Sequence, residues 1–299
     1  MSAYSEFDGG RTAIRAAPSH RSRPAARHGA AAWLYVAIFA AILLLMWPVA
    51  WMISTSFKVP EEIFTNPPRW IPERPTLDGY RAALSAQIVR NFWNSIVIAA
   101  GSTVVALFVG TLAAYGMSRL EFRGKSTVMM LILATLGIPI PMLMISLYLL
   151  FAATDILNTY TAVILGHVAI TLPVVIWLLR DFIDSLPKEL EDAATVDGAG
   201  PFYILFRIVV PLMQPGLAAA AIFVFISSWN EFIFGVTFTS SARMRPLPAG
   251  ITDLFLQELQ YRWGDTMAVG IIVTLPVMLL FLFFQRFFVH GVTAGAVKG

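Results

Sequence analysis

The chain of 299 residues contains no cysteine and only four histidines. Without cysteine it cannot form disulfides, a thiolate nucleophile or a cysteine-based metal site. The histidines stand at positions 20, 28, 167 and 290, and this spacing does not match that of metal ligands. We therefore expect this chain to bind no metal ion.

Charged residues are also scarce. They make up 13% of the chain, compared with about 25% in a typical soluble domain. Apolar residues make up 58%, and the mean hydropathy is +0.72. In water such a chain would expose large apolar patches and aggregate, so we predict a protein of the lipid bilayer. The net charge of +3 is small, and the basic residues flank apolar runs, so a nucleic-acid partner is not expected.

Several catalytic motifs are missing from the sequence. It has no GxxxxGK[ST] phosphate loop, no HExxH and no GxSxG, and each of these patterns would signal a particular active-site chemistry. We therefore predict that the chain is not an enzyme and binds no cofactor.

Long uncharged stretches dominate the rest of the sequence. Each can cross about 30 Å of hydrocarbon as a helix, which needs about 20 residues, and a helix pairs its own backbone groups in lipid. We predict an all-α integral membrane protein with six transmembrane helices in the region 33–290, followed by a C-terminal tail at 291–299. The stretches are Gly29–Phe57, Asn91–Ser118, Ser126–Thr154, Ile156–Leu179, Ile208–Asn230 and Thr266–Gln285.

The first stretch also allows a reading as a cleaved signal peptide. Its apolar part is too long and too aromatic for one, and no small-residue cleavage site follows, so a retained helix is favoured. The preceding arm at 1–32 is rich in Arg, Ala, Ser and Pro. Because it has few bulky apolar residues with which to form a core, we expect it to be disordered.

Basic residues predict the orientation in the membrane. Of the 21 Lys and Arg, 13 lie in the arm, the 118–127 loop, the 180–207 loop and the tail, all on one side of a six-span chain. Cytoplasmic loops carry the excess of Lys and Arg. Both termini and the 180–207 loop are therefore expected in the cytoplasm.

The stretch 187–211 is polar at its start and lies between two apolar runs. Pro187 suits the first turn of a helix and Ser185 a cap before it, while Gly198 suits a left-handed end. We expect a short helix that ends at Gly198, a sharp turn at Gly200-Pro201 and a second helix that leads into the fifth span, so that the loop is rigidly continuous with that span. Helical spacing places one set of the short helix's residues on a single docking face: Leu186, Leu190, Ala193 and Ala194.

This stretch resembles the cytoplasmic "EAA" loop of ABC importer permeases. The family spacing is kept by Asp192-Ala193-Ala194, then Gly198, then Ile208, Val210 and Pro211, with Asp192 in place of Glu and Val210 in place of Leu. The resemblance implies that the loop couples the chain to an ATPase subunit. The residues implied are Glu191, Asp192, Ala193, Ala194, Asp197, Gly198, Ile208 and Pro211.

The C-terminal end, from Gly291 to Gly299, resembles the ending of maltose-type carbohydrate permeases, as do the segments 119–125 and 263–265. The resemblance implies a permease subunit of a bacterial carbohydrate or polyol importer in the inner membrane. Its implied partners are a second homologous permease, two ATPase subunits that use ATP, and an extracytoplasmic solute-binding protein. Which sugar is carried cannot be read from these motifs.

Polar residues near the span ends are candidates for the substrate pathway. An aromatic plate with hydrogen-bonding groups suits a sugar, and Trp229, Asn230 and Glu231 offer both. Asn94 opens the second span. The alternative for these residues is anchoring at the membrane interface. His167 is more simply explained as a helix-packing residue.

A secondary carrier or channel is the alternative class of protein. It would need ionisable groups within the membrane for ion coupling, and the span centres contain no Asp, Glu, Lys or Arg. Proline at 139, 141 and 173 predicts kinks within the third and fourth spans.

Overall fold

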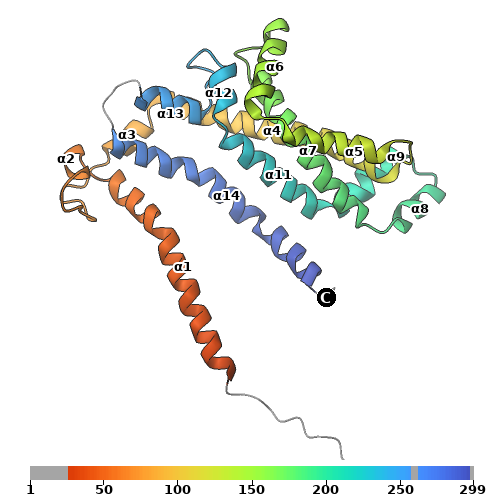
Figure 1. Cartoon of the computed structure of the whole chain (residues 1–299), viewed down its shortest axis with the longest axis horizontal. Helices are drawn as coiled ribbons and strands as arrows, with labels where there is room; N and C mark the ends of the chain where they lie inside the picture. The colour runs from red at the N-terminus through yellow and green to blue at the C-terminus, as the bar shows by residue number, and fades with distance from the viewer. Residues whose placement is uncertain (1–25, 257–261, 297–299) are drawn as a thin grey trace, which may run out of the picture. The chain divides into compact units, whose positions relative to one another are not determined.

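The computed structural model of the chain describes residues 26–256 and 262–296 (Figure 1). In this part every regular element is a helix and no strand occurs. The all-α prediction is therefore confirmed for these residues. The predicted arm before residue 26, and residues 297–299 of the predicted tail, lie outside them.

The helices follow in this order: α1 (Ala26–Ser56), α2 (Pro60–Ile63), α3 (Asp78–Ala83), α4 (Ala86–Arg119), α5 (Lys125–Ala134), η1 (Thr135–Gly137), α6 (Ile140–Ala153), α7 (Tyr160–Asp184), α8 (Glu189–Val196), α9 (Pro201–Ile204), η2 (Leu205–Val209), α10 (Val210–Leu212), α11 (Gln214–Trp229), α12 (Ile233–Phe238), α13 (Leu247–Leu256) and α14 (Trp263–Ala296). Element η1 is a 3₁₀ helix and η2 is a π-helix. The last helix, α14, runs past the predicted end of the sixth span at Gln285 and into the predicted tail.

The chain divides into two units, residues 1–50 and 51–299. The first unit holds most of α1. Its described side chains, from Trp33 to Ala50, are all exposed and almost all apolar. A helix that is apolar on every face is suited to lipid, as the retained first span predicts.

Among the described residues, four helices are long and apolar enough to cross a membrane, namely α1, α4, α7 and α14. Two further apolar pairs are bent. The pair formed by α5–η1 and α6 bends by 100°, and the pair formed by 201–212 and α11 bends by 81°. The chain has six spans if each bent pair crosses once, so the count of six stays a prediction.

The bend between η1 and α6 lies at a proline, as predicted. Ile138 precedes Pro139 and is extended, with φ −75° and ψ 123°. A proline disfavours the helical conformation in the residue before it and cannot donate a backbone hydrogen bond. Pro173, in contrast, lies inside α7, which continues through it.

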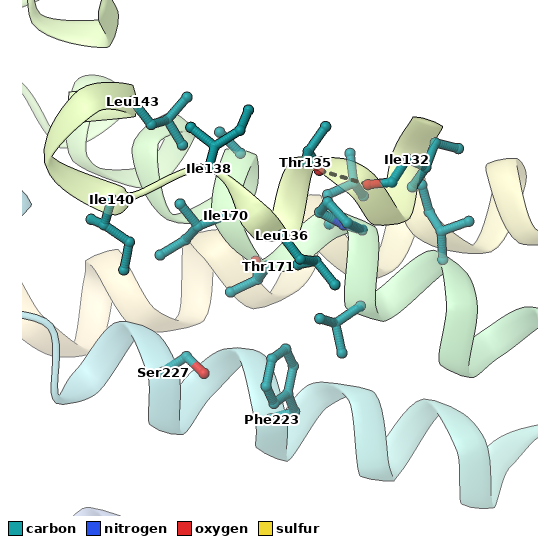
Figure 2. A pocket seen from close by; sticks show the side chains of 15 residues that line it. Ile132, Thr135, Leu136, Ile138, Ile140, Leu143, Ile170, Thr171, Phe223 and Ser227 are labelled. Carbon is teal, nitrogen blue, oxygen red and sulfur yellow. Dashed lines mark hydrogen bonds between the residues drawn. The ribbon is translucent and has the colours of Figure 1, made fainter. Parts of the chain in front are cut away.

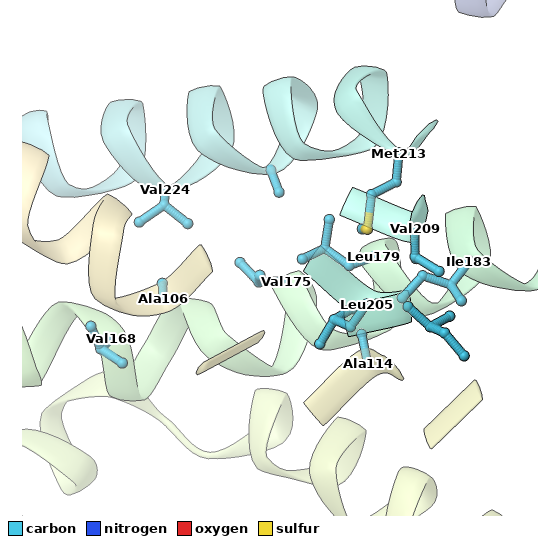
Figure 3. Close-up of a cluster of buried hydrophobic side chains, with 12 residues drawn as sticks. Ala106, Ala114, Val168, Val175, Leu179, Ile183, Leu205, Val209, Met213 and Val224 are labelled. Atoms are coloured by element: carbon cyan, nitrogen blue, oxygen red, sulfur yellow. The ribbon is translucent and has the colours of Figure 1, made fainter. Parts of the chain in front are cut away.

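The largest buried cluster joins α4, α7 and α11 with the segment 204–213 that leads into α11 (Figure 3). It contains Ala106 and Ala114 from α4, Val175 and Leu179 from α7, and Val224 from α11. Small residues on α4 let the α7 backbone approach closely, which is how helices in lipid commonly associate.

Gly110 lies between these two alanines in sequence and is the closest point of the α4–α7 contact. A Cβ atom added there would meet Cγ1 of Val175 at 2.5 Å. That separation is too short for two carbon atoms, so only glycine fits without movement of α7.

The opposite end of the α4–α7 pair carries the short helices α3, α12 and α13. Helix α13 begins at Leu247, and Pro248 fits its first turn. Residues 257–261, which follow it, lie outside the described part of the chain. In the proline-rich loop before α3, the buried carboxylate of Glu62 accepts hydrogen bonds from the backbone N–H groups of Glu73 and Arg74, both at 3.1 Å.

Candidate functional site

Helix α8 is the short helix predicted between the fourth and fifth spans, and it lies at the end of α7 (Figure 1). Its C-terminus is closed by two backbone hydrogen bonds, from Gly198 N to Thr195 O at 3.0 Å and from Ala199 N to Ala194 O at 2.9 Å. This is the Schellman pattern, in which the residue after the cap is left-handed. Gly198 has φ +85°, so its predicted conformation is confirmed.

The start of α8 differs from the prediction. Ser185 is the C-terminal cap of α7, and its hydroxyl donates to the carbonyl of Phe182 at 2.7 Å. Helix α8 begins only at Glu189. The prediction that Ser185 caps α8 was wrong because α7 extends to Asp184 and uses the serine for its own end.

Most of α8 is exposed: only Glu191 is buried and Ala194 partly buried among its eight residues. Glu189, Asp192, Ala193 and Val196 are exposed, and their spacing of three and four positions places them side by side in a stripe on the outer face. The predicted docking face is therefore only partly right. Leu190 and Ala193 are exposed, whereas Leu186 and Ala194 pack against the buried cluster of Figure 3.

Glu191 points away from this stripe and into the protein. It is 8% exposed. One carboxylate oxygen accepts from Nε of Arg119 at 2.7 Å, and the other accepts from the hydroxyl of Tyr115 at 3.1 Å. Of the residues that the EAA resemblance implied for coupling, Glu191 thus holds α8 to α4, while the neighbouring Asp192 faces outward.

The remaining residues of the motif lie around the same end. Asp197 is exposed, Ile208 packs against the buried cluster, and Pro211 lies in the first turn of α10, where its missing N–H is tolerated. Phe202 and Tyr203 follow α8 and are 70% and 60% exposed. Sequence reasoning missed these two aromatic residues, although they stand inside the motif.

The connection from α8 to the fifth span is interrupted. It passes through the left-handed Gly198, the π-helix η2 and the bend of 81° at Met213. The predicted turn and second helix are observed, since α9 begins at Pro201, but the connection to the fifth span is not one continuous helix. Pro211 and Pro215 explain part of the interruption, because neither can donate the helical hydrogen bond to the carbonyl four residues earlier.

Trp229, at the end of α11, is buried and 2% exposed. Its ring stacks on Phe225 with centroids 5.9 Å apart and meets Phe92 edge-on at 5.6 Å. The indole Nε1 donates to the carbonyl of Val273 at 3.3 Å. The prediction that this indole offers a plate to a sugar was wrong for this conformation, because the ring is part of the packing between α4, α11 and α14.

Glu231 caps the next helix. Its carboxylate accepts from the backbone N–H of Ile233 at 2.7 Å and of Phe234 at 2.9 Å. Burial raises the pKa of this carboxyl, and the backbone donors act in the opposite direction. His167 Nε2 lies 4.0 Å from the carboxylate, and its ring packs beside Phe234, which fits the predicted packing role of this histidine.

Asn94 holds a loop rather than facing open space. It is 3% exposed. Its Nδ2 donates to the carbonyls of Arg243 and Arg245 at 2.9 and 2.8 Å, and its Oδ1 accepts from the hydroxyl of Tyr160 at 2.7 Å. The amide is thus occupied by the protein, which does not support the prediction that it contacts substrate. Asn230 is exposed, and its place in the pathway stays a prediction.

A cavity of about 500 Å³ lies between the bent α5–α6 pair, α7 and α11 (Figure 2). Its wall is mostly apolar, and it was not predicted from the sequence. Phe223 and Ser227 of α11 face it from one side, and Thr171 of α7 from another. Ser227 thus lines this cavity, whereas Trp229 does not. Within 26–256 and 262–296, no three acidic or histidine side chains are grouped as a metal site requires.

Together these features define a class of protein: a multi-pass helical membrane protein with a cavity between its helices and a rigidly held surface helix at one end. The chain belongs to the family of binding-protein-dependent transport system inner membrane components, whose pattern matches residues 85–294.

Relatives with assigned names match over most of their length. The sulfoquinovosyl glycerol transport system permease protein SmoH of Agrobacterium fabrum is 36% identical over 265 residues, which cover 88% of this chain and 93% of the relative. The trehalose/maltose transport system permease protein MalG of Thermococcus litoralis is 36% identical over 266 residues, which cover 88% and 95%.

Solved structures share the fold. A chain of a bacterial ABC transporter that imports the acidic polysaccharide alginate superposes with a TM-score of 0.75 at 19% identity, over 89% of this chain and all of that one. A chain of the MetNI methionine ABC transporter gives a TM-score of 0.52 at 18% identity, over 69% and 95%. The chain is therefore a transport component of the inner membrane rather than an enzyme.

Proposed function

We propose that this chain is one of two permease subunits of an ABC importer and that it forms half of the path for a carbohydrate or related polyol. The observation that carries the proposal is α8, a short helix fixed to the membrane helices by Glu191 with an exposed stripe on its other side. Relatives with 36% identity are named as permeases for sulfoquinovosyl glycerol and for trehalose or maltose, which supports a sugar substrate.

The exposed stripe of α8 is the proposed docking surface for an ATPase subunit. Glu189, Asp192, Ala193 and Val196 on this stripe, with the exposed Phe202 and Tyr203 after it in the chain, combine two negative charges with small and aromatic residues. Such a mixture of an apolar centre and a charged edge suits a protein interface. Two ATPase subunits would hydrolyse ATP, one below each permease.

The proposed substrate path runs beside the cavity of Figure 2. Phe223 and Ser227 are one helical turn apart on α11 and supply an aromatic face and a hydroxyl group. A second, homologous permease would complete the path, and an extracytoplasmic binding protein would deliver the substrate. A solved relative of the fold is an alginate ABC transporter in complex with an alginate-bound periplasmic protein, which supports this arrangement.

A carrier or channel that works without ATP is not favoured. Ion coupling would call for ionisable side chains inside the membrane. In the described spans the Asp, Glu, Lys and Arg residues lie toward the ends, as Arg119 and Asp184 do, and the side chains that line the cavity are apolar or carry a hydroxyl group.

Reconstitution tests the proposal directly. The chain is co-expressed with an ATPase, a second permease and a binding protein from the same organism, and the purified complex is placed in liposomes. Uptake of radiolabelled sugars is expected only with the binding protein outside and MgATP inside. Uptake that continues without ATP, or with an ATPase subunit unable to hydrolyse it, would overturn the proposal.

A further inference from the structure

Arg119 is the last residue of α4, and its guanidinium joins three helices. It donates from Nε to Glu191 of α8 at 2.7 Å and from Nη2 to the carbonyl of Ile183 at 2.9 Å, with a longer contact to the carbonyl of Leu186 at 3.4 Å. The two carbonyls belong to the last turn of α7 and the residues just after it. A cation at the C-terminus of a helix is favourable because the free carbonyls there carry partial negative charge.

The ion pair is almost completely removed from solvent. The side chains of Arg119 and Glu191 are 9% and 11% exposed. Both oxygens of Glu191 are hydrogen-bonded, the second to Tyr115, which lies one turn before Arg119 on α4. We call these three residues the clasp.

A buried ion pair is a weak source of stability, since well-packed apolar residues often serve as well. Its geometry, however, is directional, because each hydrogen bond fixes one side chain relative to another. The clasp therefore sets the position of α8 more than it adds to the free energy of folding. The clasp matters here because α8 and α11 are not joined by one continuous helix. Gly198, η2 and the bend at Met213 interrupt the path between them.

Of the helices that the clasp joins, α7 lines the cavity. The middle of α7 contributes Ala169 and Thr171 to the wall, and α4 packs along α7 through Gly110. A movement of α8 is thus transmitted to α7 and α4 through the clasp, and from there to the cavity.

We propose that Arg119 and Glu191 are positioning residues of the coupling step, which hold α8 so that a movement of the docked ATPase displaces α4 and α7. This inference rests on the proposed function. It means that the movement of α8 is transmitted through α4 and α7, which precede α8 in the chain, as well as through the fifth span that follows it.

The test uses the whole importer in lipid nanodiscs, with cysteine-free partner subunits. Because this chain has no cysteine, an Ala169→Cys substitution gives one reporter on the cavity wall of α7. Its rate of labelling by a small maleimide is measured with and without MgATP and vanadate. In the otherwise unchanged chain, we expect the nucleotide to change this rate.

In the Glu191→Gln variant, which keeps the size of the side chain, the nucleotide response is expected to fall about fivefold or more. The Arg119→Gln variant should behave alike, Arg119→Lys should retain part of the response, and Tyr115→Phe should lose least. Sugar transported per ATP hydrolysed should fall in the same order. Copurification with the ATPase should be unchanged, because the outer stripe of α8 is intact.

Glu121→Gln is the matched control. Glu121 lies near the same end of α4 and pairs with Lys125 at 3.5 Å, but it is 85% exposed and does not touch α8. If Arg119→Gln proves too unstable to purify, Glu191→Gln and Tyr115→Phe still decide the question.

A full nucleotide response and full transport per ATP in Glu191→Gln, in an assembled complex, would overturn the role of the clasp and leave the proposed function standing. An unchanged chain that neither copurifies with the ATPase nor responds to nucleotide would overturn the proposed function, and the clasp's role in coupling with it.

Discussion

At the scale of single residues, a substitution at Gly198 tests the effect of backbone conformation without adding a side-chain clash. Its φ of +85° is strained for any other residue, yet a Cβ atom added there would meet nothing within 4 Å. Gly200 is equally open, but its φ is −77°. The two glycines therefore differ in backbone conformation and not in available space.

The Gly198→Val variant should lose coupling. A β-branched residue in the left-handed region costs on the order of 1–3 kcal/mol, so the end of α8 should unwind and its docking stripe should shift. Transport per ATP hydrolysed is expected to fall strongly, while Gly200→Ala should stay close to the unchanged chain. Equal losses in both variants would mean that the left-handed conformation of Gly198 is not what coupling depends on.

Trp229 and Asn230 are neighbours with opposite surroundings, one buried and one exposed. Trp229→Ala removes a ring that packs on Phe225 and Phe92, and such a loss costs about 3–5 kcal/mol. We expect a clear drop in the melting temperature of the complex in detergent. Asn230→Ala should leave that temperature unchanged and act, if at all, on sugar uptake. A normal melting temperature for Trp229→Ala would show that the indole is not part of the packing.

At the scale of helices, some features follow from neighbouring residues and others do not. The left-handed end of α8 and the bend at Pro139 depend on a few adjacent residues, and both could be predicted. The rotation of α8 about its axis could not, because it is set by the pairing of Glu191 with Arg119, 72 positions away. The burial of Trp229 likewise depends on Phe92 and Val273, which lie on other helices.

The α4–α7 contact gives a test in which two effects have opposite signs. Replacing a helical glycine with alanine stabilises an isolated helix by about 1 kcal/mol. At Gly110 the added Cβ would meet Val175 at 2.5 Å, whereas at Gly116 the nearest atom is Cδ1 of Leu120 at 3.8 Å. We therefore expect Gly110→Ala to lower the melting temperature and Gly116→Ala to leave it equal or higher. Adding Val175→Ala should recover part of the loss at Gly110, and no recovery would mean that the helices do not touch there.

At the scale of the whole molecule, three contacts limit how the chain crosses the membrane. Arg119 at the end of α4 binds Glu191 of α8, so these two points lie on one side. Asn94, near the start of α4, binds the loop at 243–245, so those two lie together toward the other side. Since α7 crosses once between α4 and α8, the bent α5–α6 pair must also cross once, and so must the pair that ends in α11. This parity supports six spans, although long apolar helices alone number four in the described part of the chain.

Labelling of single cysteines tests this topology. The excess of Lys and Arg predicts a cytoplasmic position for Glu121 and an external one for Ile71; both are exposed, Ile71 to 82% and the side chain of Glu121 to 85%. Thr154, exposed between α6 and α7, is external only if the bent pair crosses. We expect a membrane-impermeant maleimide to label Ile71→Cys and Thr154→Cys in intact cells, and Glu121→Cys only after permeabilisation. If Thr154→Cys, like Glu121→Cys, is labelled only after permeabilisation, then α5 and α6 form a re-entrant loop and the chain has one span fewer. If Glu121→Cys alone is labelled in intact cells, the whole orientation is the reverse of the predicted one.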